Sequence, residues 1–143
     1  MRELARRHAA TLASDPLHLR EARERLVGLM LDEGFASEDA HDLAVAFSEA
    51  CANVHRHAYE GRSDGRLELS VTIENDRVVV ALDHDGRSFD PAQVAPPDLR
   101  RPSEGGYGLY LIASLVDEVS FGEAGSGRRL TLVKRMKKGK VRG

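Results

Sequence analysis

Apolar positions along the chain follow first a helical and then a strand-like period. They recur at helical spacing over residues 19–30, which predicts a first helix between Asp15 and Gly34. Asp15 and the proline after it are typical of a helix start, and Gly34 can supply the left-handed residue that ends a helix. A second helix, with Ser37 as its expected cap, should run to about Tyr59. A short strand is expected around residues 10–12.

In the middle of the chain, the pattern of apolar side chains is typical of strands. Residues 67–73 alternate apolar and polar side chains, and residues 77–82 are apolar enough to be covered on both faces. The turn at residues 75–76 joins them into a hairpin. Four prolines between residues 89 and 103 argue against regular structure there and predict a connection or a lid.

A third helix and two strands complete the pattern. Glycines at residues 105–108 open a helix that should end near residue 116, and strands are expected over residues 118–121 and 128–134. Helices separated from antiparallel hairpins predict an α+β fold, a two-layer sandwich with helices on one face of a mixed or antiparallel sheet. We expect a single domain over residues 1–136 and a basic, flexible tail over residues 137–143.

Composition narrows the class of protein. A chain of 143 residues, 41% hydrophobic and 31% charged, is typical of one folded domain. Its net charge of −2 gives no general attraction to nucleic acid. No stretch approaches the roughly 18 apolar residues of a membrane span. The first residues lack the apolar centre of a secretory signal, so we expect a cytoplasmic protein.

Three polar residues of the second helical stretch recur every four positions. Glu49, Asn53 and His57 therefore line one edge of that helix, beside its apolar face. A carboxylate and an amide held there can place a general base and an oxygen ligand for magnesium around one phosphate. The same spacing also arises on an ordinary solvated helix, so the stripe alone leaves both interpretations open.

Two glycine-containing segments favour a binding site. Asp83 and Asp85 follow a buried strand and precede Gly86, where the missing side chain lets a flat ligand approach the backbone. Gly106 and Gly108 precede a helix and can direct backbone N–H groups at phosphate oxygens. A helix-capping turn is the alternative explanation of the second pair.

The order of these segments and the residues in them resemble a known family, the anti-sigma-factor serine kinases within the Bergerat-fold ATPases. The stretch LAVAFSEACANVHRHAY at residues 43–59 is similar to that family's N box. DGRSFDP at residues 85–91 is similar to its first glycine box, and GYGLYLI at residues 106–112, with DEV at residues 117–119, to its second. The resemblance covers most of the chain and implies the Bergerat ATP-binding fold of histidine kinases, gyrase and Hsp90.

The resemblance also implies roles for the matched residues. Glu49 would be the base that activates the attacking hydroxyl, and Asn53 would hold magnesium against the triphosphate of ATP. The other residues expected around the nucleotide are His57, Asp83, Asp85, Gly86, Gly106, Gly108 and Leu109.

Partners follow from the same resemblance. The hydroxyl would belong to a serine on an anti-anti-sigma protein of the STAS type, and the same surface region would alternatively hold a sigma factor. Members of the family commonly form dimers, which implies a homodimer. Neither nucleic acid nor a membrane is expected as a direct partner.

The match departs from the family at the base pocket. His84 stands where the family usually has an aspartate that accepts a hydrogen bond from the adenine amino group, and Arg129 stands where a threonine is common. These departures favour an alternative function, a module on the same fold that sequesters a partner without efficient use of ATP. A detached histidine-kinase catalytic domain is less favoured, because the chain leaves no room for phospho-acceptor helices.

Overall fold

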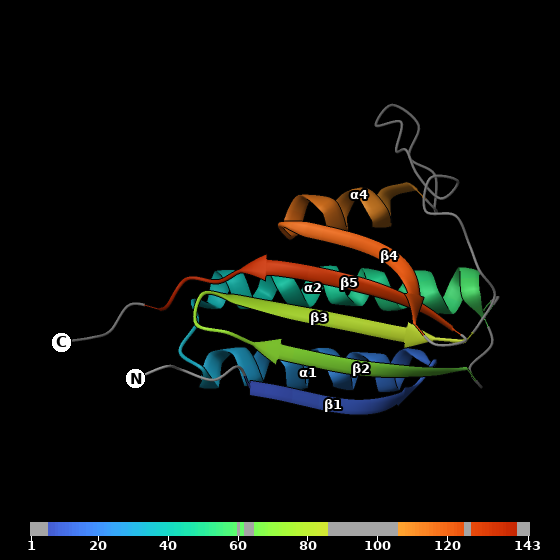
Figure 1. Cartoon of the computed structure of the whole chain (residues 1–143), viewed down its shortest axis with the longest axis horizontal. Helices are drawn as coiled ribbons and strands as arrows, with labels where there is room; N and C mark the ends of the chain where they lie inside the picture. Colours follow the sequence, from blue (N-terminus) through green and yellow to red (C-terminus); the bar gives the residue numbers. More distant parts are fainter. Residues whose placement is uncertain (1–5, 60, 62–64, 86–105, 125–126, 140–143) are drawn as a thin grey trace.

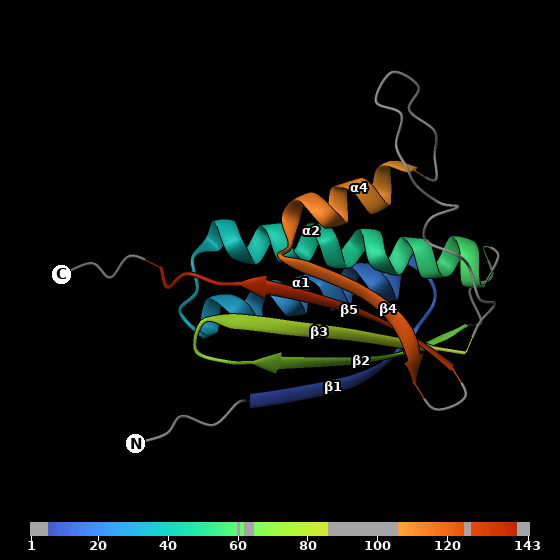
Figure 2. The same cartoon turned by 45° about the horizontal axis from the view of Figure 1, so that its top comes forward.

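The computed structural model describes residues 6–59, 61, 65–85, 106–124 and 127–139 (Figure 1). The elements, in chain order, are β1 (Arg6–Ala13), α1 (Pro16–Asp32), α2 (Ser37–Asn53), the π-helical segment η1 (Val54–Ala58), β2 (Arg66–Ile73), β3 (Arg77–His84), α4 (Gly106–Leu115), β4 (Glu118–Ala124) and β5 (Gly127–Arg135). The strands form one antiparallel sheet in the order β1-β2-β3-β5-β4. The helices cover one face of it (Figure 2). The predicted α+β sandwich is confirmed.

The core lies between α2 and the middle of the sheet. Helix α2 contacts both α1 and α4, and its fully buried Leu43 and Phe47 are part of one apolar cluster with residues of β3 and β5. Strand β3 buries alternate residues, with Val80 and Leu82 on the helix-facing side. The same alternation continues to the end of β3 and decides which of its polar residues face the helices.

The predicted start of the first helix is confirmed and that of the second shifts by one residue. Asp15 caps α1 by accepting a hydrogen bond from the backbone N of His18 at 3.0 Å. Gly34, with a φ of 85°, follows α1 as predicted. Helix α2 begins at Ser37, so Ala36 occupies the cap position and no side chain caps the helix. Ala36 is extended there, as cap residues usually are, and its N–H donates to the carbonyl oxygen of Lys137 at 2.7 Å.

Residues 137–139 contact the connection between α1 and α2, where the sequence suggested a solvated end. The backbone N of Lys137 donates to Oδ2 of Asp39 at 2.8 Å, and the backbone N of Gly139 donates to the carbonyl oxygen of Gly34 at 2.7 Å. The Lys138 ammonium lies 4.3 Å from the centre of the Phe35 ring. A flexible tail stays a prediction only for residues 140–143, which lie outside the described residues.

Other boundaries differ modestly from the sequence-based predictions. Strand β3 continues two residues past its predicted end, to His84, and the second helix changes from α to π geometry after Asn53. The proline-rich connection at residues 89–103 lies outside the described residues. Within the described part of the chain, no helix is both long and apolar enough to cross a membrane.

Candidate functional site

Asn53, the last residue of α2, turns a polar side chain into the protein interior. It is 4% exposed, and its Oδ1 accepts no hydrogen bond from any residue that the structure describes. A buried amide oxygen left without a partner costs about 1–3 kcal/mol. Such an atom is suited to a bound ligand or metal that supplies the missing contact.

A cavity lies beside Asn53, between α2, α4 and the ends of three strands. Its lining includes Asn53, Val54, His84, Ile112, Phe121 and Arg128. The described residues enclose about 50 Å³, well below the ~300–1,000 Å³ of a complete small-molecule site. The lining combines apolar side chains with a few polar groups.

His84 lines this cavity from the end of β3. It is 8% exposed and shares the helix-facing side of the strand with Leu82. Burial lowers the pKa of its imidazole, and the charge of Arg128 lowers the pKa further, whereas Asp85 and Asp83 oppose the shift. The His84 ring is therefore neutral at pH 7.

Arg128 and Arg129 lie on opposite sides of β5, and both line the cavity. Arg128 is the register partner of His84 and shares the helix-facing side with it. Arg129 faces the outer side of the sheet, where its guanidinium donates to both carboxylate oxygens of Asp83, at 2.6 and 2.8 Å. Asp83 is held in this ion pair and is not among the residues that line the cavity, so its predicted contact with a nucleotide stays a prediction.

Gly127 allows β5 to approach the end of β3 closely. A Cβ at residue 127 would lie 2.5 Å from the carbonyl oxygen of His84, closer than real Cβ contacts. Only glycine avoids this clash. This contact brings the first residue of β5 against the carbonyl group that ends β3.

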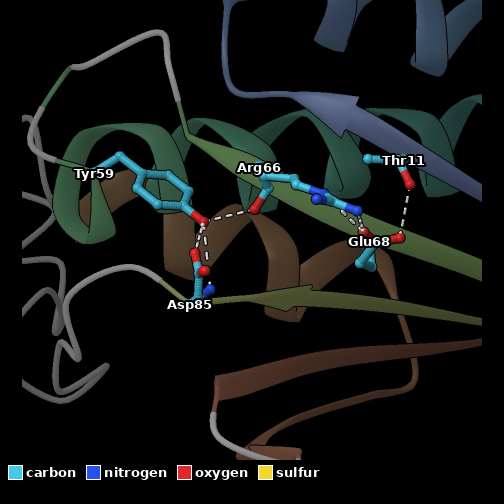
Figure 3. A network of polar contacts seen from close by, with 5 residues as sticks. All are labelled: Thr11, Tyr59, Arg66, Glu68 and Asp85. Atoms are coloured by element: carbon cyan, nitrogen blue, oxygen red, sulfur yellow. Dashed lines mark hydrogen bonds and ion pairs between the residues drawn. The ribbon is translucent and has the colours of Figure 1, made fainter.

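Tyr59 links the end of η1 to the ends of β2 and β3 (Figure 3). Its hydroxyl oxygen lies 2.6 Å from the carbonyl oxygen of Arg66 and 2.9 Å from Oδ1 of Asp85. It also accepts a hydrogen bond from the backbone N of Asp85 at 3.3 Å. Burial raises the pKa of the phenol, and the hydrogen bond to Asp85 adds to the rise, so the hydroxyl keeps its proton. The sequence did not identify Tyr59 as a site residue.

Glu49 lies one helical turn before Asn53 and is half-buried. Among the described residues, no group of three or more His, Cys, Asp and Glu residues is arranged to hold a metal ion. Magnesium usually keeps several waters and takes one or two protein ligands together with substrate phosphates. The single Oδ1 of Asn53 fits that mode of binding.

The remaining predicted residues are only partly placed. Gly106, Gly108 and Leu109 form the first turn of α4, so the glycines stand at the start of a helix as expected. His57 belongs to η1, but its side chain lies outside the described part of the structure, as does Gly86. Their predicted contacts with a nucleotide stay predictions.

Sequence comparison relates the chain to kinases of known family. The model of the family described as "Histidine kinase-like ATPase domain" matches residues 12–134. A serine-protein kinase RsbW of Listeria monocytogenes is 34% identical over 116 residues, which cover 76% of this chain and 74% of the relative. A serine-protein kinase RsbW of Bacillus pumilus is 31% identical over 140 residues, covering 91% of this chain and 86% of the relative.

Solved structures support the fold. The RsbU and RsbW domains of Rv1364c from Mycobacterium tuberculosis align with a TM-score of 0.66 and 19% identity, over 95% of this chain but only 35% of that one. The SiaB–SiaC complex from Pseudomonas aeruginosa includes a chain that aligns with a TM-score of 0.62 and 17% identity, over 90% of this chain and 88% of the other. Because the family model matches residues 12–134 of the chain, the chain belongs to the histidine kinase-like ATPase domain family.

Proposed function

We propose that the chain is an ATP-dependent protein serine kinase that binds its nucleotide at the cavity beside Asn53. The observation that carries the proposal is the buried Oδ1 of Asn53, which has no partner among the described residues and lines a cavity in an ATPase-type domain. The serine-protein kinases that are 31–34% identical to the chain support the choice of reaction.

In this proposal Glu49 acts as the base and Asn53 as the metal ligand. The oxygen of the substrate serine attacks the γ-phosphorus of ATP, the hydroxyl proton passes to the Glu49 carboxylate, and ADP leaves. The Oδ1 of Asn53 would hold magnesium, which neutralises phosphate charge when bound. The first turn of α4 would direct its backbone N–H groups at phosphate oxygens, and the missing side chains of Gly106 and Gly108 leave room for that approach.

The proposed substrate is a serine on a STAS-type anti-anti-sigma protein, with a sigma factor as the alternative partner. Support comes from the resemblance of the N box and the two glycine boxes to the anti-sigma-factor serine kinases, together with the RsbW relatives. We further propose that the chain works in the cytoplasm as a homodimer, as that family implies.

A second candidate is a module that sequesters a partner without efficient use of ATP. His84 and Arg129 motivate it, because they stand where the family usually has an aspartate and a threonine. A guanidinium has no acceptor for the adenine amino group, and a neutral imidazole offers one ring nitrogen where a carboxylate offers two oxygens.

Calorimetric titration with ATP and GTP, with and without magnesium, separates the two candidates. Magnesium-dependent ATP binding, followed by transfer of labelled phosphate to a serine of a STAS-type protein from the same genome, is expected of the kinase. A stable complex with that protein or with a sigma factor, combined with no nucleotide binding, is expected of the sequestering module. Binding of neither nucleotide nor partner would contradict both.

A further inference from the structure

We propose that Tyr59 is a positioning residue for nucleotide binding, whose hydroxyl holds the end of β3 against the helix that carries Asn53. The inference rests on the proposed function, because it concerns the same cavity. It assigns Tyr59 no contact with the reacting atoms. Its role is to keep two walls of the cavity in place, one formed by Asn53 and the other by His84.

The backbone connects Tyr59 closely to Asn53. Segment η1 continues directly from Asn53, and the backbone N of Tyr59 donates to the carbonyl oxygen of Val54 at 3.0 Å. A π-helical segment changes the direction in which following side chains point, and such segments are frequent at functional sites. Here the segment ends with Tyr59 only 3% exposed and directed at the sheet.

Close packing holds the Tyr59 ring in one place. On one side lies the backbone of Gly65, where an added Cβ would be 2.4–2.6 Å from three ring atoms. The ring of His84 lies edge-on to it, with centroids 6.2 Å apart and planes at 71°. The hydroxyl therefore has little freedom to move away from its partners.

The hydroxyl joins both strand ends to the helix. It lies within hydrogen-bond distance of the carbonyl oxygen of Arg66 at the start of β2 and of Oδ1 of Asp85 just after β3. It has one proton, so it donates to one of these acceptors at a time, while it accepts from the backbone N of Asp85. Figure 3 shows these contacts converging on the single oxygen.

The contact with the Asp85 backbone fixes the peptide plane that follows His84. The N–H of Asp85 and the carbonyl group of His84 belong to the same planar peptide unit. Its N–H side is bound by Tyr59, and its oxygen side packs against the α-carbon region of Gly127. The orientation of His84 toward the cavity thus depends on a peptide plane held from both sides.

The variant that tests this role is Tyr59→Phe, which removes the hydroxyl and keeps the ring. Thr11→Val is the matched control, since the Thr11 hydroxyl donates to Glu68 at 2.8 Å in the same group of polar residues but at the exposed edge strand (Figure 3). Both variants are first checked by circular dichroism for a folded population equal to that of the unchanged chain. Two quantities are then measured: the dissociation constant for magnesium–ATP, and the hydrogen-exchange rate of the Asp85 amide without nucleotide.

We expect Tyr59→Phe to raise the dissociation constant about tenfold, a loss of ~1.4 kcal/mol, because nucleotide binding must then also order the end of β3, and to speed exchange of the Asp85 amide. Thr11→Val should change neither quantity. Asp85→Ala removes the carboxylate that accepts from the Tyr59 hydroxyl and keeps the backbone N–H that donates to it. Because the two side chains share the first of these contacts, the double variant should weaken binding by less than the product of the two single effects.

Three outcomes would overturn the inference. A dissociation constant for Tyr59→Phe within twofold of the unchanged chain would do so, and so would fully multiplicative effects of the Tyr59 and Asp85 variants. In both cases the proposed function would stand. No nucleotide binding by the unchanged chain would instead overturn the proposed function, and the inference with it.

Discussion

Glu49 and Asn53 belong to the same polar stripe of α2, yet their surroundings differ. Asn53 is buried with an unpartnered amide oxygen among the described residues, whereas Glu49, four residues earlier, is half-buried. A metal ligand benefits from a buried, fixed position, and a base must be reached by the hydroxyl of a second protein. The difference in burial therefore agrees with the roles proposed for the two residues.

Glu49→Gln should slow phosphoryl transfer by about 10²–10⁴-fold, because it removes a proton acceptor without changing the volume of the side chain. Nucleotide and partner binding should stay close to those of the unchanged chain. The measurement is transfer of labelled phosphate beside calorimetric ATP titration, with exposed Glu24→Gln as the charge-matched control. Transfer at the unchanged rate would remove Glu49 from the mechanism.

His84 gives the chain a predictable dependence on pH. Because burial lowers the pKa of the folded-state imidazole, the unfolded chain binds this proton more readily below about pH 6.5. The free energy of unfolding should therefore fall as the pH drops below about 6.5. The stability that comes from burying a neutral His84 is fully present above that pH. His84→Gln should flatten the slope of urea-unfolding free energy against pH below about pH 6.5. A slope equal to that of the unchanged chain would contradict the burial argument.

At the scale of elements, the join between α2, η1 and the hairpin β2–β3 organises the site. The sequence predicted one continuous helix to Tyr59, but only the first part is α-helical. The change to π geometry follows Asn53 directly and places the Tyr59 ring against Gly65. A glycine in a polar turn thus has a packing role that a turn pattern does not reveal.

Gly65→Ala should destabilise the fold by about 1–3 kcal/mol, because the new methyl group overlaps the buried Tyr59 ring. Gly28→Ala is the matched control. No atom lies within 4 Å of an added Cβ at residue 28, which is inside α1, so that substitution should stabilise the chain by ~0.5–1 kcal/mol. Urea unfolding measures both. A neutral Gly65→Ala would show that the ring can move aside at little cost.

At the scale of the whole molecule, residues 136–139 bind segments that are far away in the sequence. Residues 137–139 pair with the α1–α2 connection, and the backbone N of Met136 donates to the carbonyl oxygen of Asp76 at 2.8 Å. Lysines in a polar, glycine-containing end look like a solvated tail from composition alone. Their backbone groups nevertheless satisfy donors and acceptors near the start of α2.

A chain ending at Met136 should lose about 2–4 kcal/mol of unfolding free energy, since several hydrogen bonds of ~0.5–1.5 kcal/mol each are removed. A chain ending at Gly139 keeps those contacts and is the control. The comparison is made by urea unfolding at pH 7. Equal stability of the two chains would show that the contacts of residues 137–139 contribute nothing measurable.

The sequence by itself determined the elements, their order, the α+β class and the residues of the polar stripe. Helical and strand periods, Asp15 as a cap and Gly34 as an end are local properties, so they can be read from neighbouring residues. The resemblance of the N box and the glycine boxes likewise depends only on which residues stand in which order along the chain, and it pointed to the family.

Only the tertiary structure decided which side chains face the cavity. Whether Arg128 or Arg129 lies beside His84 depends on the register of β3 with β5, and a shift of one residue reverses every side chain of a strand. The pairing of Asp83 with Arg129 and the contacts of Tyr59 join residues far apart in the chain. Such contacts arise from packing between elements, which no local pattern of residues specifies.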